Sequence, residues 1–200
     1  MAQLRRFDDS SEAQLLVAKI LLSQNDVSGA NSALETALSF DFTVKEHPLY
    51  LLVQGKNQRA KKSFAEAIKW LKTGLASQGL SSSDKVSISL ELAETLNEAG
   101  RADEASDLLR KTVAEFSGTS EEGRLITAQA DLALEANRVD QALEILNSIG
   151  PSEMHYLEAR HKMAEIYLVH KKDRRKFAAC YLSIVEQKPG VDSQVQIKES

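Results

Sequence analysis

The chain has 200 residues with a formal net charge of −4, and 42% of them are hydrophobic and 27% charged, as in ordinary folded proteins. Three prolines, nine glycines and only 6% aromatic residues favour helices over a many-stranded β fold, and the single cysteine, Cys180, excludes an internal disulfide and suggests a reducing compartment. Because no apolar run reaches membrane-spanning length and the N-terminus lacks a signal-peptide core, we expect a soluble chain without direct membrane insertion.

Apolar residues recur at three- and four-residue spacing in pairs of segments, which predicts a series of helical hairpins. Pro48 suits the first turn of a helix, Ser83 or Asp84 is expected to cap the third hairpin, and Gly150-Pro151 ends the fourth. The predicted repeats, in chain order, are roughly 11–42, 48–79, 85–116, 122–150 and 154–188. We expect them to form a single array over residues 1–190, with a polar tail at 191–200 that marks a cut from a longer chain.

Each predicted hairpin carries small residues where two closely crossing helices leave little room. The first-helix positions follow one another at steps of 37, 38, 37 and 34 residues, and the second-helix positions at steps of 37, 38 and 37. In the fifth hairpin, Phe177-Ala178 stands at the small-residue position of the second helix, and Tyr181 stands at the position of a large side chain that follows it. The small positions are Ala18, Gly55, Ala93, Ala130 and Ala164 in the first helices, and Ala30, Ala67, Ala105 and Ala142 in the second.

This constant register predicts the fold class. It is all-α, a right-handed superhelical solenoid of about five tetratricopeptide-like helical hairpins. An unrelated helical bundle is the alternative. Neither end has an obvious polar capping helix, so we also expect that the chain can self-associate through its uncapped ends.

Motifs for catalysis, cofactors and metals do not stand out. Glu158 and His161 have the spacing of a di-iron helix pair, but the required second copy is missing. Cys180 is expected to pack as a small hydrophobe, and no glycine-rich phosphate loop or nucleophile elbow occurs. We therefore expect no enzyme, no catalytic residues, no cofactor and no metal. The four histidines, expected at the surface or partly satisfied, are His47, His155, His161 and His170.

Charge is segregated along the chain. Residues 48–80 hold six Lys/Arg against one acid, residues 81–150 six against fourteen, and residues 151–189 eight against five. The net charge disfavours nucleic acid, and the acidic middle with basic flanks favours protein partners of opposite charge.

The basic turn, defined as residues 171–176, carries five cations in six residues. It is a candidate site for an acidic partner or a nuclear-localisation patch, and the alternative is a solvated turn whose cations suit a helix C-terminus. A second cluster, with the same two interpretations, comprises Lys56, Arg59, Lys61 and Lys62. The candidate partner-binding residues are Lys171, Lys172, Arg174, Arg175 and Lys176.

Tetratricopeptide grooves that clamp a C-terminal carboxylate place Lys, Asn and Arg at fixed first-helix positions. The corresponding places here hold Leu15, Lys19, Val53, Ser87 and Glu91. Only Lys19 could serve, and Glu91 would repel a carboxylate, so a chaperone-tail binder is not expected.

About sixty residues toward the C-terminal end carry a more specific likeness. The stretch includes Tyr156-Leu-Glu-Ala-Arg160, residues 162–168, the basic run from Lys171, Cys180-Tyr181 and Pro189. It resembles the tetratricopeptide repeat protein twenty-one family, the large tetratricopeptide subunit of intraflagellar transport complex A. The resemblance implies a fragment of a longer solenoid that acts in retrograde ciliary transport and cargo entry.

The functional expectation is a non-catalytic protein–protein interaction scaffold. Its partners would be other protein subunits of a transport complex, and the resemblance implies a location in the cytoplasm, the cilium or flagellum and the basal body. A general tetratricopeptide adaptor that binds peptide segments of cargo is the alternative, and an enzymatic function would require a metal or cofactor.

Overall fold

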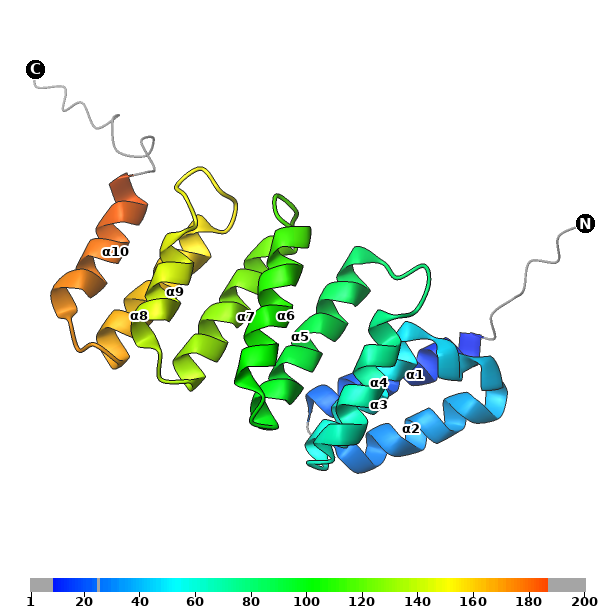
Figure 1. Cartoon of the computed structure of the whole chain (residues 1–200). Helices are drawn as coiled ribbons and strands as arrows, with labels where there is room; N and C mark the ends of the chain where they lie inside the picture. Colours follow the sequence, from blue (N-terminus) through cyan, green and yellow to red (C-terminus); the bar gives the residue numbers. More distant parts are fainter. Residues whose placement is uncertain (1–8, 25, 187–200) are drawn as a thin grey trace, which may run out of the picture. The chain divides into compact units, whose positions relative to one another are not determined.

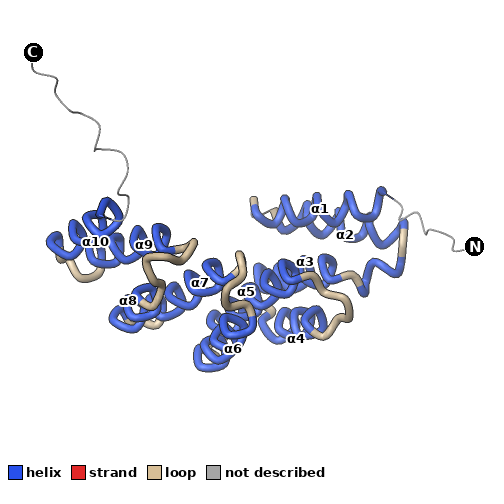
Figure 2. The backbone as a smooth tube through the Cα atoms, turned by 90° about the horizontal axis from the view of Figure 1, so that it is seen from above, coloured by secondary structure: helices blue, strands red, loops and turns tan. Residues whose placement is uncertain are grey.

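The structure, a computed structural model, describes residues 9–24 and 26–186, and within these ranges all regular structure is helical (Figures 1 and 2). The predicted tail at 191–200 lies outside the described residues. In chain order the helices are α1 (Asp9–Ser23), α2 (Val27–Phe40), the 3₁₀ helix η1 (Phe42–Glu46), α3 (Pro48–Ala60), α4 (Phe64–Leu75), α5 (Ser82–Glu98), α6 (Ala102–Glu115), α7 (Glu122–Glu135), α8 (Val139–Asn147), α9 (Tyr156–Val169) and α10 (Arg174–Glu186).

The helices form two compact units, the first ending at Phe116 and the second beginning at Ser117. Unit 1 contains the hairpins α1–α2, α3–α4 and α5–α6, and within it α3 also contacts α1 and α5. Unit 2 contains α7–α8 and α9–α10, joined by contacts between α8 and α9. The all-α prediction is confirmed, whereas the single array over residues 1–190 stays a prediction.

All nine small positions are buried, so the helices of each hairpin approach closely. A Cβ atom added to Gly55 would lie 2.5 Å from Cδ2 of Leu71, whose side chain is 0% exposed. The fifth hairpin departs from the expectation, because Ala178 is exposed and Cys180 is the buried residue of α10. The thiol is small enough to stand where the other second helices place alanine.

Local capping explains where several helices begin. Pro48 opens α3, as predicted, and Nδ1 of the preceding His47 accepts a hydrogen bond from the Leu49 N–H at 3.2 Å. The prediction of Ser83 or Asp84 as the cap of α5 is wrong. Ser81 is the cap, since its hydroxyl oxygen accepts the Asp84 N–H at 3.1 Å and donates to the Asp84 carboxylate at 2.6 Å.

The connector before Pro48 is more ordered than its sequence pattern predicts. Asp41 accepts hydrogen bonds from the backbone N–H and the hydroxyl of Thr43, at 2.8 and 2.7 Å, and so caps η1. Val44 of η1 is buried and belongs to the same hydrophobic cluster as residues of α1, α2 and α3. The connector therefore helps to close the core of unit 1.

Candidate functional site

The basic turn comprises the end of the connection between α9 and α10 and the first turn of α10, in unit 2. The Asp173 carboxylate accepts the N–H groups of Arg175 and Lys176, at 3.1 and 3.0 Å, and caps the start of α10. The interpretation that these cations suit a helix C-terminus is therefore wrong for residues 174–176, which stand in the first turn of α10, directly after the Asp173 cap. Cations at this end of a helix oppose its dipole.

The five cations of the basic turn divide into two groups. Nζ of Lys171 lies 2.7 Å from Oδ1 of Asp140 on α8, and Nζ of Lys176 lies 5.3 Å from the ring centroid of Tyr167 on α9. These two are engaged within the unit. The other three are exposed and have no ion-pair partner among the residues that the structure describes: Lys172, Arg174 and Arg175.

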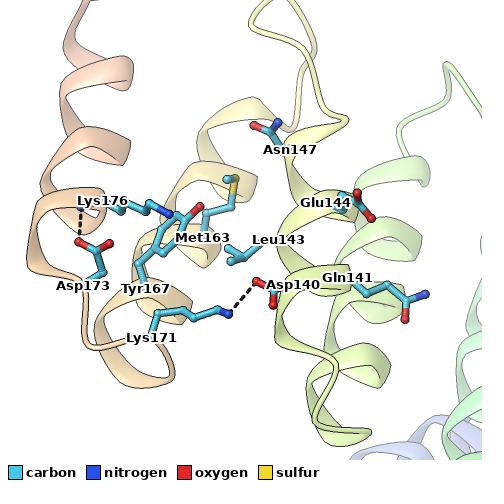
Figure 3. A pocket seen from close by; sticks show the side chains of 10 residues that line it. All are labelled: Asp140, Gln141, Leu143, Glu144, Asn147, Met163, Tyr167, Lys171, Asp173 and Lys176. Atoms are coloured by element: carbon cyan, nitrogen blue, oxygen red, sulfur yellow. Dashed lines mark hydrogen bonds and ion pairs between the residues drawn. The ribbon is translucent and has the colours of Figure 1, made fainter.

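A hollow of about 600 Å³ lies beside the turn, between α8, α9 and the start of α10 (Figure 3). We call it the α8–α9 hollow. Leu143 and Met163 are 8% and 5% exposed at its apolar floor, and the half-buried ring of Tyr167 lies next to them. Its lining residues are Asp140, Gln141, Leu143, Glu144, Asn147, Met163, Tyr167, Lys171, Asp173 and Lys176.

Two contacts hold the walls of the hollow together. The Lys171–Asp140 ion pair connects the turn with α8, and Nη1 of Arg160 donates to Oδ1 of Asn147 at 2.8 Å, which connects α9 with the end of α8. The described lining residues do not combine a nucleophile with an oriented base. The arrangement is one that can bind, and we assign no reaction to it.

The second basic cluster has a different environment. In unit 1, Glu91 of α5 is only 4% exposed and lies 2.7 Å from Nζ of Lys56 and 2.7 Å from Nε of Arg59. Nη1 of Arg59 also reaches Glu94 at 2.8 Å and Glu98 at 2.9 Å. Lys56 and Arg59 are thus neutralised by their own chain, whereas Lys61 and Lys62 of the same cluster are exposed.

Electrostatics in this cluster follow from burial and proximity. Burial alone would lower the pKa of Arg59, but the three carboxylates of α5 outweigh it and raise that pKa. Burial raises the pKa of Glu94, and Arg59 offsets part of this effect. Oε1 of Glu91 receives no hydrogen bond from any described residue despite its short distance to Arg59, so the pair is held by charge and not by aligned donors.

Three of the five places of a carboxylate clamp are buried, and Lys19 is exposed. Leu15 and Val53 are 1% and 0% exposed, and Glu91 is buried against Lys56. Sequence reasoning expected Glu91 to repel an incoming carboxylate. In the structure its own carboxylate occupies the position between the two cations that such a ligand would need.

His155, His161 and Cys180 lie close to other residues of unit 2. The ring of His155 fills the space that a side chain at Gly123 would need, and Nδ1 of His161 lies 3.4 Å from the Tyr181 hydroxyl. Burial raises the pKa of the Cys180 thiol, with a smaller opposing effect of Arg160. No group of three or more His, Cys, Asp or Glu residues within residues 9–24 and 26–186 is placed to hold a metal ion.

Both ends of the described chain expose apolar side chains. Leu16 and Ile20 of α1 are 54% and 56% exposed, and Leu182 and Val185 of α10 are 60% and 68% exposed. Self-association through these faces stays a prediction. None of the described helices is long and apolar enough to cross a membrane.

Helical hairpins that repeat with nearly constant spacing are typical of a tetratricopeptide-like helical repeat protein. Solved structures with this fold align with the chain. A Podosopora anserina kinesin light chain protein with nearly identical TPR-like repeats aligns with a TM-score of 0.62 at 19% identity, covering 92% of this chain and 100% of that one. PilW, a type IV pilus biogenesis factor, aligns at 0.59 with 14% identity, covering 88% and 77%.

The family model described as Tetratricopeptide repeat protein 21 ARM repeat matches residues 42–184, and the chain belongs to this family. Tetratricopeptide repeat protein 21B of Xenopus laevis is 37% identical over 95% of this chain, and that of Homo sapiens 36% over 88%. The Caenorhabditis elegans homolog is 38% identical over 94%. The chain spans only 15–16% of the length of these relatives.

Proposed function

We propose that this chain is a protein-interaction segment of an intraflagellar transport complex A subunit, which acts in retrograde transport and in cargo entry at the cilium and basal body. Family membership and the helical repeat fold support a scaffold role. The ciliary assignment depends on the resemblance of residues 131–190 to that subunit. The proposed partners are other protein subunits of the complex.

The observation that carries the proposal is the set of three unpaired cations on the basic turn. The Asp173 cap and the Lys171–Asp140 pair fix the backbone of the turn, and Lys172, Arg174 and Arg175 have no ion-pair partner in the described part of the chain. A positive surface of this kind accelerates association with an acidic protein and disfavours basic ones. We therefore assign the partner contact to these three residues and a supporting role to Lys171 and Lys176.

The test compares the chain with a variant that carries Lys172→Asn, Arg174→Gln and Arg175→Gln. Lys172 has φ 54°, which asparagine tolerates well, and Lys171 is kept because it connects the turn with α8. Three exposed charge contacts of ordinary strength predict about tenfold weaker capture of complex subunits from ciliated-cell lysate, measured by quantitative mass spectrometry.

A matched control neutralises three cations in unit 1, with Lys61→Gln, Lys62→Asn and Lys69→Gln. All three are exposed, and Lys62 has φ 59°, the same backbone conformation as Lys172. The control should capture the complex as well as the unmodified chain does. Equal capture by both variants, with equal helical content in circular dichroism, would remove the basic turn from the proposal.

A peptide adaptor is the second candidate function. It is favoured by the α8–α9 hollow, whose apolar floor can take a side chain from a short segment. The two functions differ in one measurable respect. An adaptor binds an isolated peptide, whereas a subunit contact requires a larger folded surface.

A further inference from the structure

We propose that one face of α10 is a docking surface for an amphipathic helix of another protein, a helix that carries carboxylates at one end of its apolar face. The inference rests on the protein-interaction role proposed above, and it names the kind of segment that would contact the basic turn. We call this face the α10 stripe. Its residues are Arg175, Ala178, Ala179, Leu182 and Val185.

The α10 stripe is continuous because its residues follow one another at intervals of three and four positions. An α-helical turn holds 3.6 residues, so side chains at this spacing lie on one side of the helix. All five are exposed, and Leu182 and Val185 are among the most exposed large apolar side chains of the described part of unit 2. The stripe extends over nearly three turns, or about 15 Å.

The corresponding positions of the other second helices are polar. Cys180 takes the place of Ala142, Ala105, Ala67 and Ala30, at steps of 38, 37, 38 and 37 residues. Counted from these buried positions, Leu182 corresponds to the exposed residues Ser32, Lys69, Asp107 and Glu144, and Val185 to the exposed residues Glu35, Lys72, Arg110 and Asn147. Among the described second helices, α10 is therefore the one with large apolar side chains at both positions.

Packing of a neighbouring hairpin does not cover these positions. α4 packs against α5 and α8 against α9, yet Lys69, Lys72 and Glu144 remain exposed. The exposed Leu16 and Ile20 of α1 are a different case, because the corresponding residues of α3 and α5 are buried: Val53, Glu91, Asn57 and Thr95. The apolar face of α1 is thus of a kind that another hairpin covers, whereas the α10 stripe occupies positions that hairpin stacking leaves open.

The charges at the two ends of the stripe indicate the polarity of the partner. Arg175 stands two turns before Leu182 on the same side of α10, with Arg174 and Lys172 next to it. None of these three cations has an ion-pair partner in the described part of the chain, and Glu186 is the acidic residue at the other end. A partner helix with its carboxylates at the Arg175 end therefore complements the stripe, and a basic one is repelled.

The shape of the stripe favours a helix over a membrane. Ala178 and Ala179 leave the middle of the stripe shallow, which allows a second helix to approach closely. A helix that binds a membrane surface carries large apolar side chains along its whole face, and this stripe has only Leu182 and Val185.

Charge also disfavours a second copy of the chain as the occupant. In an antiparallel pair of α10 helices, each copy would bring Glu186 to the three free cations of the other copy. Two of those cations would lack a counter-charge in each half of the pair. A helix with several carboxylates at one end compensates them better.

The experiment measures binding of two labelled helical peptides to the whole chain by fluorescence anisotropy. Both peptides carry leucines at intervals of three and four residues, with a run of glutamates before the leucines in one and after them in the other, so that both directions of the partner helix are tested. We expect at least one of them to bind saturably. Replacing its leucines by serines should weaken binding about tenfold or more, and replacing its glutamates by glutamines about fivefold.

Two variants of the protein test the two parts of the stripe. Leu182→Gln with Val185→Gln makes these exposed positions polar, as in the other second helices, and should weaken binding about tenfold. Arg174→Gln with Arg175→Gln should weaken binding of the glutamate peptide about fivefold and leave binding of the glutamine peptide unchanged.

The matched control is Leu16→Gln with Ile20→Gln on α1, where the two side chains are 54% and 56% exposed. Binding should stay normal in this control, and all variants should keep the helical content of the unmodified chain in circular dichroism. Equal weakening in the control would show that the peptide contacts any exposed apolar side chain. That result, or the failure of both peptides to bind saturably, overturns the proposal.

The other occupants give distinct outcomes. Dimerisation of the unmodified chain that Leu182→Gln with Val185→Gln abolishes, measured by analytical ultracentrifugation, would assign the stripe to a second copy. Tighter binding of phosphatidylserine vesicles through the same two residues would assign it to a membrane, and either result overturns the proposal. If the peptides do not bind but capture of complex subunits still depends on the cations of the basic turn, this inference is wrong and the proposed function stands.

Discussion

At the scale of single residues, the tightest constraint lies where two helices cross without a side chain between them. Gly55 of α3 faces Leu71 of α4, and the leucine side chain is fully buried, so it has no free space into which to move. Gly74 is a useful comparison because it is also helical and buried, but a Cβ atom there would meet Ile88 only at 3.3 Å. The same mutation thus has different consequences at the two positions.

We predict that Gly55→Ala destabilises unit 1 by about 1–3 kcal/mol through overpacking against Leu71. Gly74→Ala raises the helix propensity by a similar amount, but its Cβ atom would meet Ile88 less closely than a Cβ atom at Gly55 would meet Leu71. It should therefore change stability by less than about 1 kcal/mol. Urea unfolding followed by circular dichroism checks both. Equal effects at the two positions would mean that Leu71 can move away, contrary to the close crossing described above.

At the scale of elements, α3 and α5 are joined by one buried carboxylate. Glu91 forms ion pairs with both Lys56 and Arg59 of α3. The more exposed Glu94 and Glu98 of α5 also form ion pairs with Arg59. A buried charge without its partners is costly, while exposed ion pairs contribute little. The stability of this helix pair should therefore depend on Glu91 far more than on surface pairs.

We predict that Glu91→Gln destabilises the protein by about 1–3 kcal/mol, because Lys56 and Arg59 then lose their shared counter-charge. The matched control is Asp107→Asn, which breaks the exposed pair with Arg110 inside α6 and should cost less than about 0.5 kcal/mol. Chemical denaturation measures both variants. A loss at Glu91 no larger than in the control would show that the pair contributes no net stability.

At the scale of the whole molecule, the two units carry separate probes. The only tryptophan, Trp70, lies in unit 1 with its ring 6.3 Å from that of Tyr50, and the only cysteine, Cys180, is buried in unit 2. Repeat proteins gain much of their stability from neighbouring repeats, so a mutation acts mainly on its surroundings. Local probes can therefore follow the two units separately.

We predict that Gly55→Ala lowers the urea midpoint of Trp70 fluorescence more than the midpoint of Cys180 labelling by iodoacetamide. Because burial raises the pKa of the Cys180 thiol, the folded protein should react slowly near pH 8 and faster as pH rises and the thiolate forms. Unfolding should remove this protection. Identical shifts of both probes would instead show one cooperative transition for the whole chain.

The sequence by itself determined the helices and most of the close crossings. Helix periodicity and capping are local properties, which is why α3 begins at Pro48 as predicted and why a regular spacing of alanine and glycine identified nine buried positions. The exceptions are also local in origin. The Ser81 cap and the ordered connector at η1 depend on hydrogen bonds that a count of apolar residues does not detect.

Only the tertiary structure decided which charges remain available. Lys171 and Lys172 look equivalent in the sequence, yet one pairs with Asp140 of another helix and the other has no partner in the described part of the chain. Likewise Glu91 is buried between two cations, and Cys180 rather than Ala178 faces inward. Each residue turns an α-helix by about 100°, so neighbouring residues on one helix point in different directions. Which of them meets a partner on another helix depends on how the two helices are rotated against each other, and the spacing of residues in the sequence does not determine that rotation.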